Sequence, residues 1–362
     1  MSTRALTTRV REGVGLFAMD ERGLLEVRGS DRIRWLDGML SADVKALEKR
    51  GEGAGAPALF LTHRGAIVAD FHVGRLGDAL LLECQRSEIP RIRAALEKRI
   101  IADDVELVDR SDRDAVLGAE GARASDVVAR ALDGDGAAGG GPAAVADVWP
   151  ERWAMGAIAG APVLLAGFGW SGERAVQIRV APAGRDAVRA ALVAAAGELG
   201  VDCVEGDRAL LEVLRIEAGI PALGAELDED VLPPEARLER TLAINKGCYV
   251  GQEIVARLRS RGQVNHLLVG LRREGGAEDL VVGASLSAAG RVTGEITSVA
   301  LSPTEGAIAL AYVRREHAEP GTALALEGFG SVRVVALPIV APASAAGAPG
   351  AAGEPGLPPS GS

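Results

Sequence analysis

The spacing of apolar residues along the chain changes at one place, the eight residues Lys246-Gly247-Cys248-Tyr249-Val250-Gly251-Gln252-Glu253. Before this stretch, strand-like runs alternate with helical stripes, whereas only strand-like runs follow the short helix behind it. Ile254 and Leu258 recur at helical spacing, and Gln252 and Glu253 would lie in the first turn, where a helix dipole favours an acidic side chain. The stretch therefore predicts a turn, then a helix, then a separate all-β part.

Cys248 in this motif has two interpretations. Gly247 and Gly251 on either side allow positive φ angles or a close approach of the backbone to a ligand. An adjacent ammonium such as that of Lys246, together with a helix N-terminus, lowers the pKa of a thiol from its usual value of about 8.5. Cys248 is thus either a reactive thiol that is partly ionised at neutral pH or a small hydrophobe that fills a turn.

Length, composition and charge limit the class of protein. The 362 residues, of which 48% are hydrophobic, suffice for two or three domains with proper cores. No run of about 18 apolar residues exists, and the first ten residues lack the apolar core of a signal peptide. The net charge of -10 argues against a general nucleic-acid-binding surface. A cytoplasmic protein that neither spans a membrane nor binds nucleic acid directly is expected.

The cysteines and histidines do not predict a resident metal. Cys84, Cys203 and Cys248 are odd in number and far apart, so a disulfide framework is not expected and a reducing compartment suits the chain. The four histidines show no metal-ligand spacing. An iron-sulfur cluster held wholly by this chain would need about four thiolates. We therefore expect no stable metal site.

Strand and helix patterns divide the chain into consecutive segments, and the predicted class is α+β. The five segments are an N-terminal α+β part over 10–132, a flexible Gly/Ala-rich linker over 133–145, a second α+β part over 146–262 that ends in the motif and its helix, a small β-barrel over 264–340 and a disordered tail over 341–362.

Two carboxylates in the α+β parts are candidates for a site. Asp70 lies in a predicted strand and shares its face with Val68 and His72, so its carboxylate points either into a pocket or out to water. Glu217 lies on the apolar stripe of a helix that Asp207 caps, in the last turn, where the helix dipole disfavours a negative charge. Such a carboxylate needs a partner. The partner is either an arginine, Arg215 or another, or a ligand with an amino-imino edge such as a pterin.

The motif and several further segments resemble one family. The chain is similar to the folate-binding YgfZ group, which is related to the aminomethyltransferase (T-protein) of the glycine cleavage system. Besides the motif, the segments that carry this resemblance are Leu214-Arg215-Ile216-Glu217-Ala218-Gly219, Gly169-Trp170-Ser171-Gly172-Glu173 and Gly294-Glu295-Ile296-Thr297-Ser298. The resemblance covers roughly residues 16–340 and implies a three-part ring of domains around a central pocket for tetrahydrofolate.

The resemblance also implies roles for individual residues. The glutamate that matches Glu217 contacts the pterin in the family, and the position of Lys246 carries a basic residue near the folate. The methyltransferases have paired aspartates where this chain has Ala69-Asp70, which weakens the expectation of aminomethyl transfer. Asp70, Glu217, Lys246 and Tyr249 are therefore expected to bind the cofactor, and Cys248 with Lys246 is expected to carry the chemistry.

The function that the resemblance implies is that of a tetrahydrofolate-binding accessory protein for the assembly or repair of iron-sulfur enzymes, including enzymes that modify tRNA. Its partners would be folate and either iron-sulfur client enzymes or assembly proteins, with Cys248 as the reactive thiol. Two alternatives remain. One is a folate-dependent aminomethyltransferase, and the other is a folate-binding module without chemistry in which Cys248 only packs.

Overall fold

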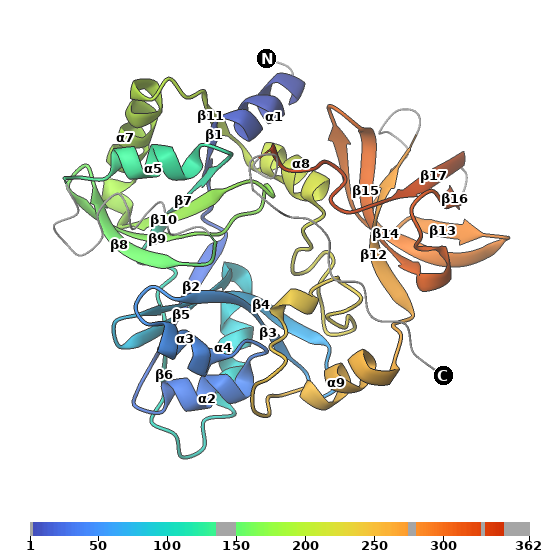
Figure 1. Cartoon of the computed structure of the whole chain (residues 1–362), viewed down its shortest axis with the longest axis horizontal. Helices are drawn as coiled ribbons and strands as arrows, with labels where there is room; N and C mark the ends of the chain where they lie inside the picture. Colours follow the sequence, from blue (N-terminus) through green and yellow to red (C-terminus); the bar gives the residue numbers. More distant parts are fainter. Residues whose placement is uncertain (1–2, 135–149, 274–279, 327–329, 344–362) are drawn as a thin grey trace.

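The computed structural model describes residues 3–134, 150–273, 280–326 and 330–343 of the chain. Figure 1 shows three lobes, each built on its own sheet, around the segment that leaves helix α8 (Arg208–Ala218). Two lobes mix helices with a sheet, and the third is a closed barrel. The predicted α+β class, with its three-part arrangement and C-terminal barrel, is confirmed.

The first sheet has five strands in the order β3-β4-β5-β2-β6. Its strands are β2 (Arg22–Arg28), β3 (Gly55–Leu61), β4 (Ile67–Leu76), β5 (Ala79–Gln85) and β6 (Glu106–Asp109). Helices α2 (Arg32–Met39), α3 (Val44–Arg50) and α4 (Ile89–Glu97) supply apolar side chains to the core on one face of it. The opposite face carries Arg22, Asp70, His72 and Glu83 together with apolar side chains such as Leu24 and Leu81, which pack against the second sheet.

The second sheet has six strands in the order β11-β1-β7-β10-β9-β8. Its strands are β1 (Val14–Ala18), β7 (Ala115–Glu120), β8 (Trp153–Ile158), β9 (Ala161–Ala166), β10 (Ala175–Val180) and β11 (Cys203–Gly206). The first segment of the chain thus supplies two strands of this sheet, and β1 pairs in parallel with β11. The two sheets are interleaved in sequence, so the predicted boundary at 133–145 does not separate them.

Helices cover the second sheet as the apolar stripes require. Helices α5 (Ala124–Ala131) and α7 (Arg185–Glu198) share a core with β7, β9 and β10, to which they contribute Val127, Val128, Val188 and Leu192. Helix α8 packs with Phe17 and Met19, close to α1 (Thr3–Glu12). Asp207 accepts a hydrogen bond from the Leu210 amide, and Gly219 follows the helix in the left-handed conformation, as the sequence indicates for the two ends.

The third part is a closed antiparallel barrel in the order β12-β15-β14-β13-β16-β17. Its strands are β12 (His266–Arg272), β13 (Ser285–Ala288), β14 (Arg291–Ser302), β15 (Gly306–Arg314), β16 (Ala323–Leu326) and β17 (Gly330–Val335). The small β-barrel predicted over 264–340 therefore forms, and its strand β13 has only four residues, too few to show alternation in the sequence. Helix α9 (Gln252–Arg261) precedes the barrel, as predicted.

Nearly all of the predicted linker (133–145) and tail (341–362) lies outside the described residues. None of the helices in the described ranges combines the length and the apolar composition that a membrane crossing needs.

The indole of Trp153 packs between the first and second sheets, against residues such as Leu24, Leu81 and Leu164. A substitution next to this indole therefore tests how tightly the two sheets pack. A Cβ on Gly74 of β4 would lie 2.5 Å from this indole ring, so we expect Gly74→Ala to lower the free energy of unfolding by about 1–3 kcal/mol. Gly38→Ala in α2 is the control, since its Cβ meets open space and should leave stability unchanged or raise it by up to about 1 kcal/mol. Urea unfolding measures both, and equal stability of the two variants would contradict this packing.

Candidate functional site

A cavity of about 590 Å³ lies where the first sheet, helix α8 and the loop behind α8 meet. Its volume is typical of sites for small molecules. It is lined by Glu21 and Arg22 at the start of β2, by Gln85, Ser87 and Glu88 after β5, by Trp170, by Arg208, Leu211, Glu212 and Arg215 of α8, and by 222–225. We call it the central cavity.

Arg22 is held tightly at the wall of the central cavity. Its Nε and Nη2 donate to the two carboxylate oxygens of Glu83 at 2.6 and 3.0 Å. Its guanidinium carbon lies 4.4 Å from the centre of the Trp170 ring. Glu83 and Arg22 are both buried, so this pair is fully committed to the protein. It forms a rigid, neutral wall rather than a free cation.

Asp70 is the predicted site residue that borders this wall. Asp70 and His72 are two residues apart on β4, so their side chains point to the same face of the first sheet, the face that also carries Arg22 and Glu83. His72 stacks on Phe168, with ring centroids 3.8 Å apart, and hydrogen bonds Glu151 at 3.1 Å. Asp70 is half-buried, and among the described residues no ion pair involves it. Burial raises the pKa of Asp70 above its usual value, against the opposing charges of Arg22 and His72.

Glu120 supports the cavity and was not anticipated. It is fully buried at the end of β7 and accepts hydrogen bonds from the Ser171 amide and hydroxyl (3.0 and 2.6 Å) and from the Trp170 amide (3.2 Å). It thereby holds the loop that presents Trp170 to the central cavity. Burial raises its pKa to about 7, although these hydrogen bonds oppose the shift. An acidic residue directly ending the apolar run 115–119 was the signal available in the sequence.

The Glu217 carboxylate forms an ion pair and a hydrogen bond with other residues of the protein. Nη2 of Arg11 lies 2.8 Å from Glu217 Oε2, and Nη1 of the same arginine lies 2.8 Å from Glu173 Oε1. The Ser302 hydroxyl of the barrel donates to Glu217 Oε1. Glu217 lies about 200° around α8 from Arg215, which lines the cavity, so its carboxylate faces away from the cavity. The expected ion pair therefore forms with an arginine other than Arg215.

The Lys246 ammonium connects the motif to the backbone at the end of α2 and just after it. Its Nζ donates to the carbonyl oxygens of Asp37, Leu40 and Ala42 at 2.6 to 2.7 Å, and its side chain is 1% exposed. An ammonium has only three donors, and these carbonyls include the end of α2. Burial lowers the pKa of Lys246, against the nearby Asp37 carboxylate. The expectation of an ammonium that faces the cofactor does not match this arrangement, because all of its donors are used.

The rest of the motif lies apart from the central cavity. Cys248 is exposed, whereas the next residue, Tyr249, is buried, with its ring centre 5.0 Å from Lys246 Nζ. Gly251 has φ +83°, and a Cβ there would lie 2.6 Å from the Thr62 carbonyl, so glycine is required. Gly247 is exposed and shows neither constraint.

Helix α9 begins at Gln252 with Glu253 in its first turn, as predicted, and Glu253 also pairs with Arg257 at 3.1 Å. Tyr249 and Gln252 border a second cavity of about 1060 Å³ between α9, the segment 239–244 and the start of the barrel.

The structure therefore brings Lys246 and Tyr249 together but leaves Asp70, Glu217 and Cys248 in separate surroundings. No group of three or more His, Cys, Asp or Glu side chains within the described ranges is arranged to hold a metal ion.

Two family models match the chain. Residues 3–246 match the GCVT N-terminal domain, and residues 267–342 match the glycine cleavage T-protein C-terminal barrel domain. Together they span both sheets, the motif lysine and the barrel.

Curated relatives and a solved structure agree with these matches. The chain is 31% identical over 338 residues to an aminomethyltransferase of Saccharopolyspora erythraea, covering 91% of this chain and 87% of the relative. It is 32% identical over 347 residues to an aminomethyltransferase of Cutibacterium acnes, covering 91% and 88%. The crystal structure of glycine cleavage system aminomethyltransferase T from Bartonella henselae has the same fold, with a TM-score of 0.78, 22% identity and coverage of 94% of this chain and 90% of that chain.

Replacing the buried ammonium tests its structural role. Lys246→Met leaves three carbonyls without their donor, so we expect the free energy of unfolding to fall by about 2–4 kcal/mol. Lys45→Met is the matched control, because Lys45 is largely exposed and Asp37 is its only ion-pair partner among the described residues, and it should cost less than about 1 kcal/mol. If denaturant unfolding shows that Lys246→Met and Lys45→Met lose the same amount of stability, the structural role of Lys246 is contradicted.

Glu120 should make stability depend on pH. Its pKa of about 7 in the folded protein lies above the ordinary value of 4.5, so its stabilising contribution is complete below pH 4.5 and is lost as pH rises to 7. We expect Glu120→Gln to remove a decline on the order of 3 kcal/mol between these limits. Urea unfolding at several pH values measures the decline, and Glu205→Gln, which alters an exposed carboxylate, should retain it. An unchanged pH profile in Glu120→Gln would refute the assignment.

Proposed function

The chain belongs to the glycine cleavage T-protein family, and from this we propose that it binds a reduced folate, tetrahydrofolate or a one-carbon derivative, in the central cavity. The observation that carries the proposal is Asp70, a half-buried carboxyl group without an ion-pair partner among the described residues. Asp70 does not line the central cavity itself, but its charge interacts with that of Arg22, which does. A free carboxyl group in such a place is a site for a polar ligand.

The residues around the cavity fit the chemistry of a folate. A pterin presents an amino-imino edge with two N–H donors, and a carboxylate accepts both in a bidentate pair. Asp70 supplies this carboxylate. Arg208 lies exposed at the rim, without an ion pair among the described residues, and would attract the carboxylates of the folate glutamate tail. Glu83 and Glu226 are already bound to arginines and are not available.

We propose Glu217 as a further pterin contact because the matching glutamate of the resembling family contacts the pterin. Glu217 is already hydrogen bonded within the protein, however, so a pterin must first displace one of its partners. Arg11 donates to Glu217 Oε2 and the Ser302 hydroxyl donates to Glu217 Oε1, and a bidentate pterin edge would need both of these acceptor oxygens. A folate that reaches Glu217 must therefore displace the Arg11 guanidinium. Asp70 requires no such displacement, so we place the pterin edge at Asp70 first.

The activity that the names of the relatives favour is aminomethyl transfer to the folate. Such a reaction needs a group that holds or accepts a proton beside the one-carbon unit. Asp70 can take this role only if Glu217 holds the amino-imino edge instead, because that edge lies across the pteridine ring from the nitrogens that carry the one-carbon unit; burial raises the pKa of Asp70 above its usual value. Tetrahydrofolate, when bound, supplies the acceptor nitrogens for the one-carbon unit.

A second candidate function is an accessory role for iron-sulfur enzymes, including tRNA-modifying ones, that depends on Cys248. The observation in its favour is that Cys248 is exposed and does not line the central cavity. A partner protein can reach such a thiol, whereas a ligand in the cavity cannot. The single aspartate at Ala69-Asp70 points the same way.

Calorimetric titration of tetrahydrofolate tests the binding proposal. We expect Asp70→Asn to weaken binding roughly tenfold to a hundredfold, because the amide loses the charge and one acceptor of the bidentate pair. Cys248→Ser is the control and should bind as the wild type does, since its side chain is exposed elsewhere. Wild-type protein that shows no binding would refute the proposal, and a loss confined to Glu217→Gln would move the pterin edge to Glu217.

Two assays then separate the candidate functions. The first adds an aminomethylated lipoyl carrier and looks for methylenetetrahydrofolate, which only an aminomethyltransferase forms. The second asks whether Cys248→Ser restores iron-sulfur enzyme activity in a deletion strain. Turnover that Cys248→Ser retains supports aminomethyl transfer, whereas absent turnover together with failed rescue supports the accessory role.

A further inference from the structure

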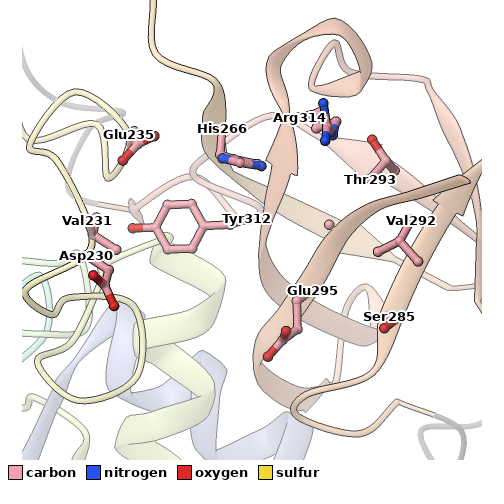
Figure 2. A pocket seen from close by; sticks show the side chains of 11 residues that line it. Asp230, Val231, Glu235, His266, Ser285, Val292, Thr293, Glu295, Tyr312 and Arg314 are labelled. Atoms are coloured by element: carbon pink, nitrogen blue, oxygen red, sulfur yellow. The ribbon is translucent and has the colours of Figure 1, made fainter.

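A third cavity, of about 390 Å³, lies between the outer face of the barrel and the loop around Asp230. Figure 2 shows that side chains from both sides point into it, with the Tyr312 ring between them. We call it the barrel cleft. It is distinct from the central cavity, with which it shares no lining residue among those described.

The strand register arranges the side chains of the barrel cleft in two rows. His266 of β12 pairs with Arg314 of β15, and Thr293 of β14 lies one step beyond the Gly294–Val313 pair, opposite Arg314. Glu295 pairs with Tyr312, two residues further along the same strands. Two residues of a strand span about 7 Å, so a row with two basic groups runs beside a row with a carboxylate at that spacing.

The charges of the barrel cleft do not neutralise one another. Arg314, His266, Glu295 and Asp230 are all exposed, and none forms an ion pair within the described part of the chain. Arg272, by contrast, which is on the same strand as His266, pairs with Glu305 at 2.8 Å. Glu235 also lines the cleft, and it accepts a hydrogen bond from the Leu232 amide at 3.0 Å. The unpaired cations and carboxylates of the cleft are thus open to a ligand that carries both charges.

A buried hydroxyl group supplies an independent sign of a ligand. Thr293 lines the barrel cleft and is 3% exposed, yet its Oγ1 has no hydrogen-bond partner among the described residues. A buried hydroxyl without a partner costs about 1–3 kcal/mol, which a ligand oxygen beside Arg314 would recover. Tyr312 provides a fixed floor, because its hydroxyl donates to the Glu226 carbonyl at 2.8 Å.

We propose that the barrel cleft binds a free α-amino acid in its zwitterionic form. The carboxylate lies at Arg314 and His266 and accepts from the Thr293 hydroxyl, and the ammonium lies at Glu295 and Asp230. The carboxyl carbon and the amino nitrogen of an α-amino acid are about 2.5 Å apart, so with a hydrogen bond at each end the ligand spans roughly 8 Å. This span matches the spacing of the two rows.

The apolar lining of the barrel cleft narrows the choice of amino acid. Val231 and the largely exposed Val292 both border it. An aliphatic side chain placed against them is removed from water, which favours binding by about 0.8 kcal/mol for each buried methylene-sized group. L-valine is therefore expected to bind more tightly than glycine.

Ligand-observed NMR titration with glycine and L-valine at up to about 10 mM tests the site. N-acetyl-L-valine lacks the ammonium and L-valinamide lacks the carboxylate, so each should bind at least about tenfold more weakly than L-valine. Binding of neither free amino acid, or equal binding of both blocked analogues and L-valine, would overturn the proposal.

Variants place the ligand in the cleft. Arg314→Gln and Glu295→Gln should each weaken L-valine binding at least about tenfold, and because both side chains are exposed the variants should unfold at the wild-type midpoint. Arg291→Gln is the matched control, since Arg291 is exposed on β14 but does not line the cleft. Binding that all three variants retain would place the amino acid elsewhere. No folate is present in these titrations, so their outcome is independent of the proposed function.

Discussion

The last turn of α8 carries two buried charges of opposite sign, and the contacts of α8 with the barrel, with α1 and with the following loop depend on how each charge is neutralised. Arg215 donates to Glu226 at 3.0 Å and to the Ser298 hydroxyl of the barrel at 2.8 Å. Glu217, two residues later, binds Arg11 and Ser302. Removing one partner of a buried pair typically costs 3–5 kcal/mol, because a buried charge is left alone. Helix α8 therefore fixes the positions of the barrel, the N-terminal helix and the following loop relative to one another.

This neutralisation decides which groups remain for ligands. The buried arginines and glutamates around α8 are committed to one another, so they shape the central cavity without offering free charge to it. Asp70, Arg208 and Glu21 are charged groups at or near the cavity that form no ion pair among the described residues. Glu226 also connects the two polar cavities, since it binds Arg215 of the central cavity and its carbonyl accepts from Tyr312 of the barrel cleft.

Local features of the fold were predictable from neighbouring residues. The ends of α8 at Asp207 and Gly219 and the start of α9 at Gln252 depend on caps and turns that a few residues specify. The barrel was recognisable from its alternating runs, except for the short β13. The place of β1 in the second sheet was not, because its parallel partner β11 lies almost 190 residues away. Periodicity shows that a strand exists but not which strand it pairs with.

The sequence by itself determined that Lys246, Cys248 and Glu217 are unusual residues, since it shows a charge on an apolar stripe and a thiol between glycines. Only the tertiary structure decided what each one contacts. Lys246 meets carbonyls more than 200 residues away, Glu217 meets an arginine from the first helix, and Cys248 is exposed to solvent. The physical reason is that a buried charge demands a partner of the right kind, which many residues could provide, and only the packing of distant segments selects one.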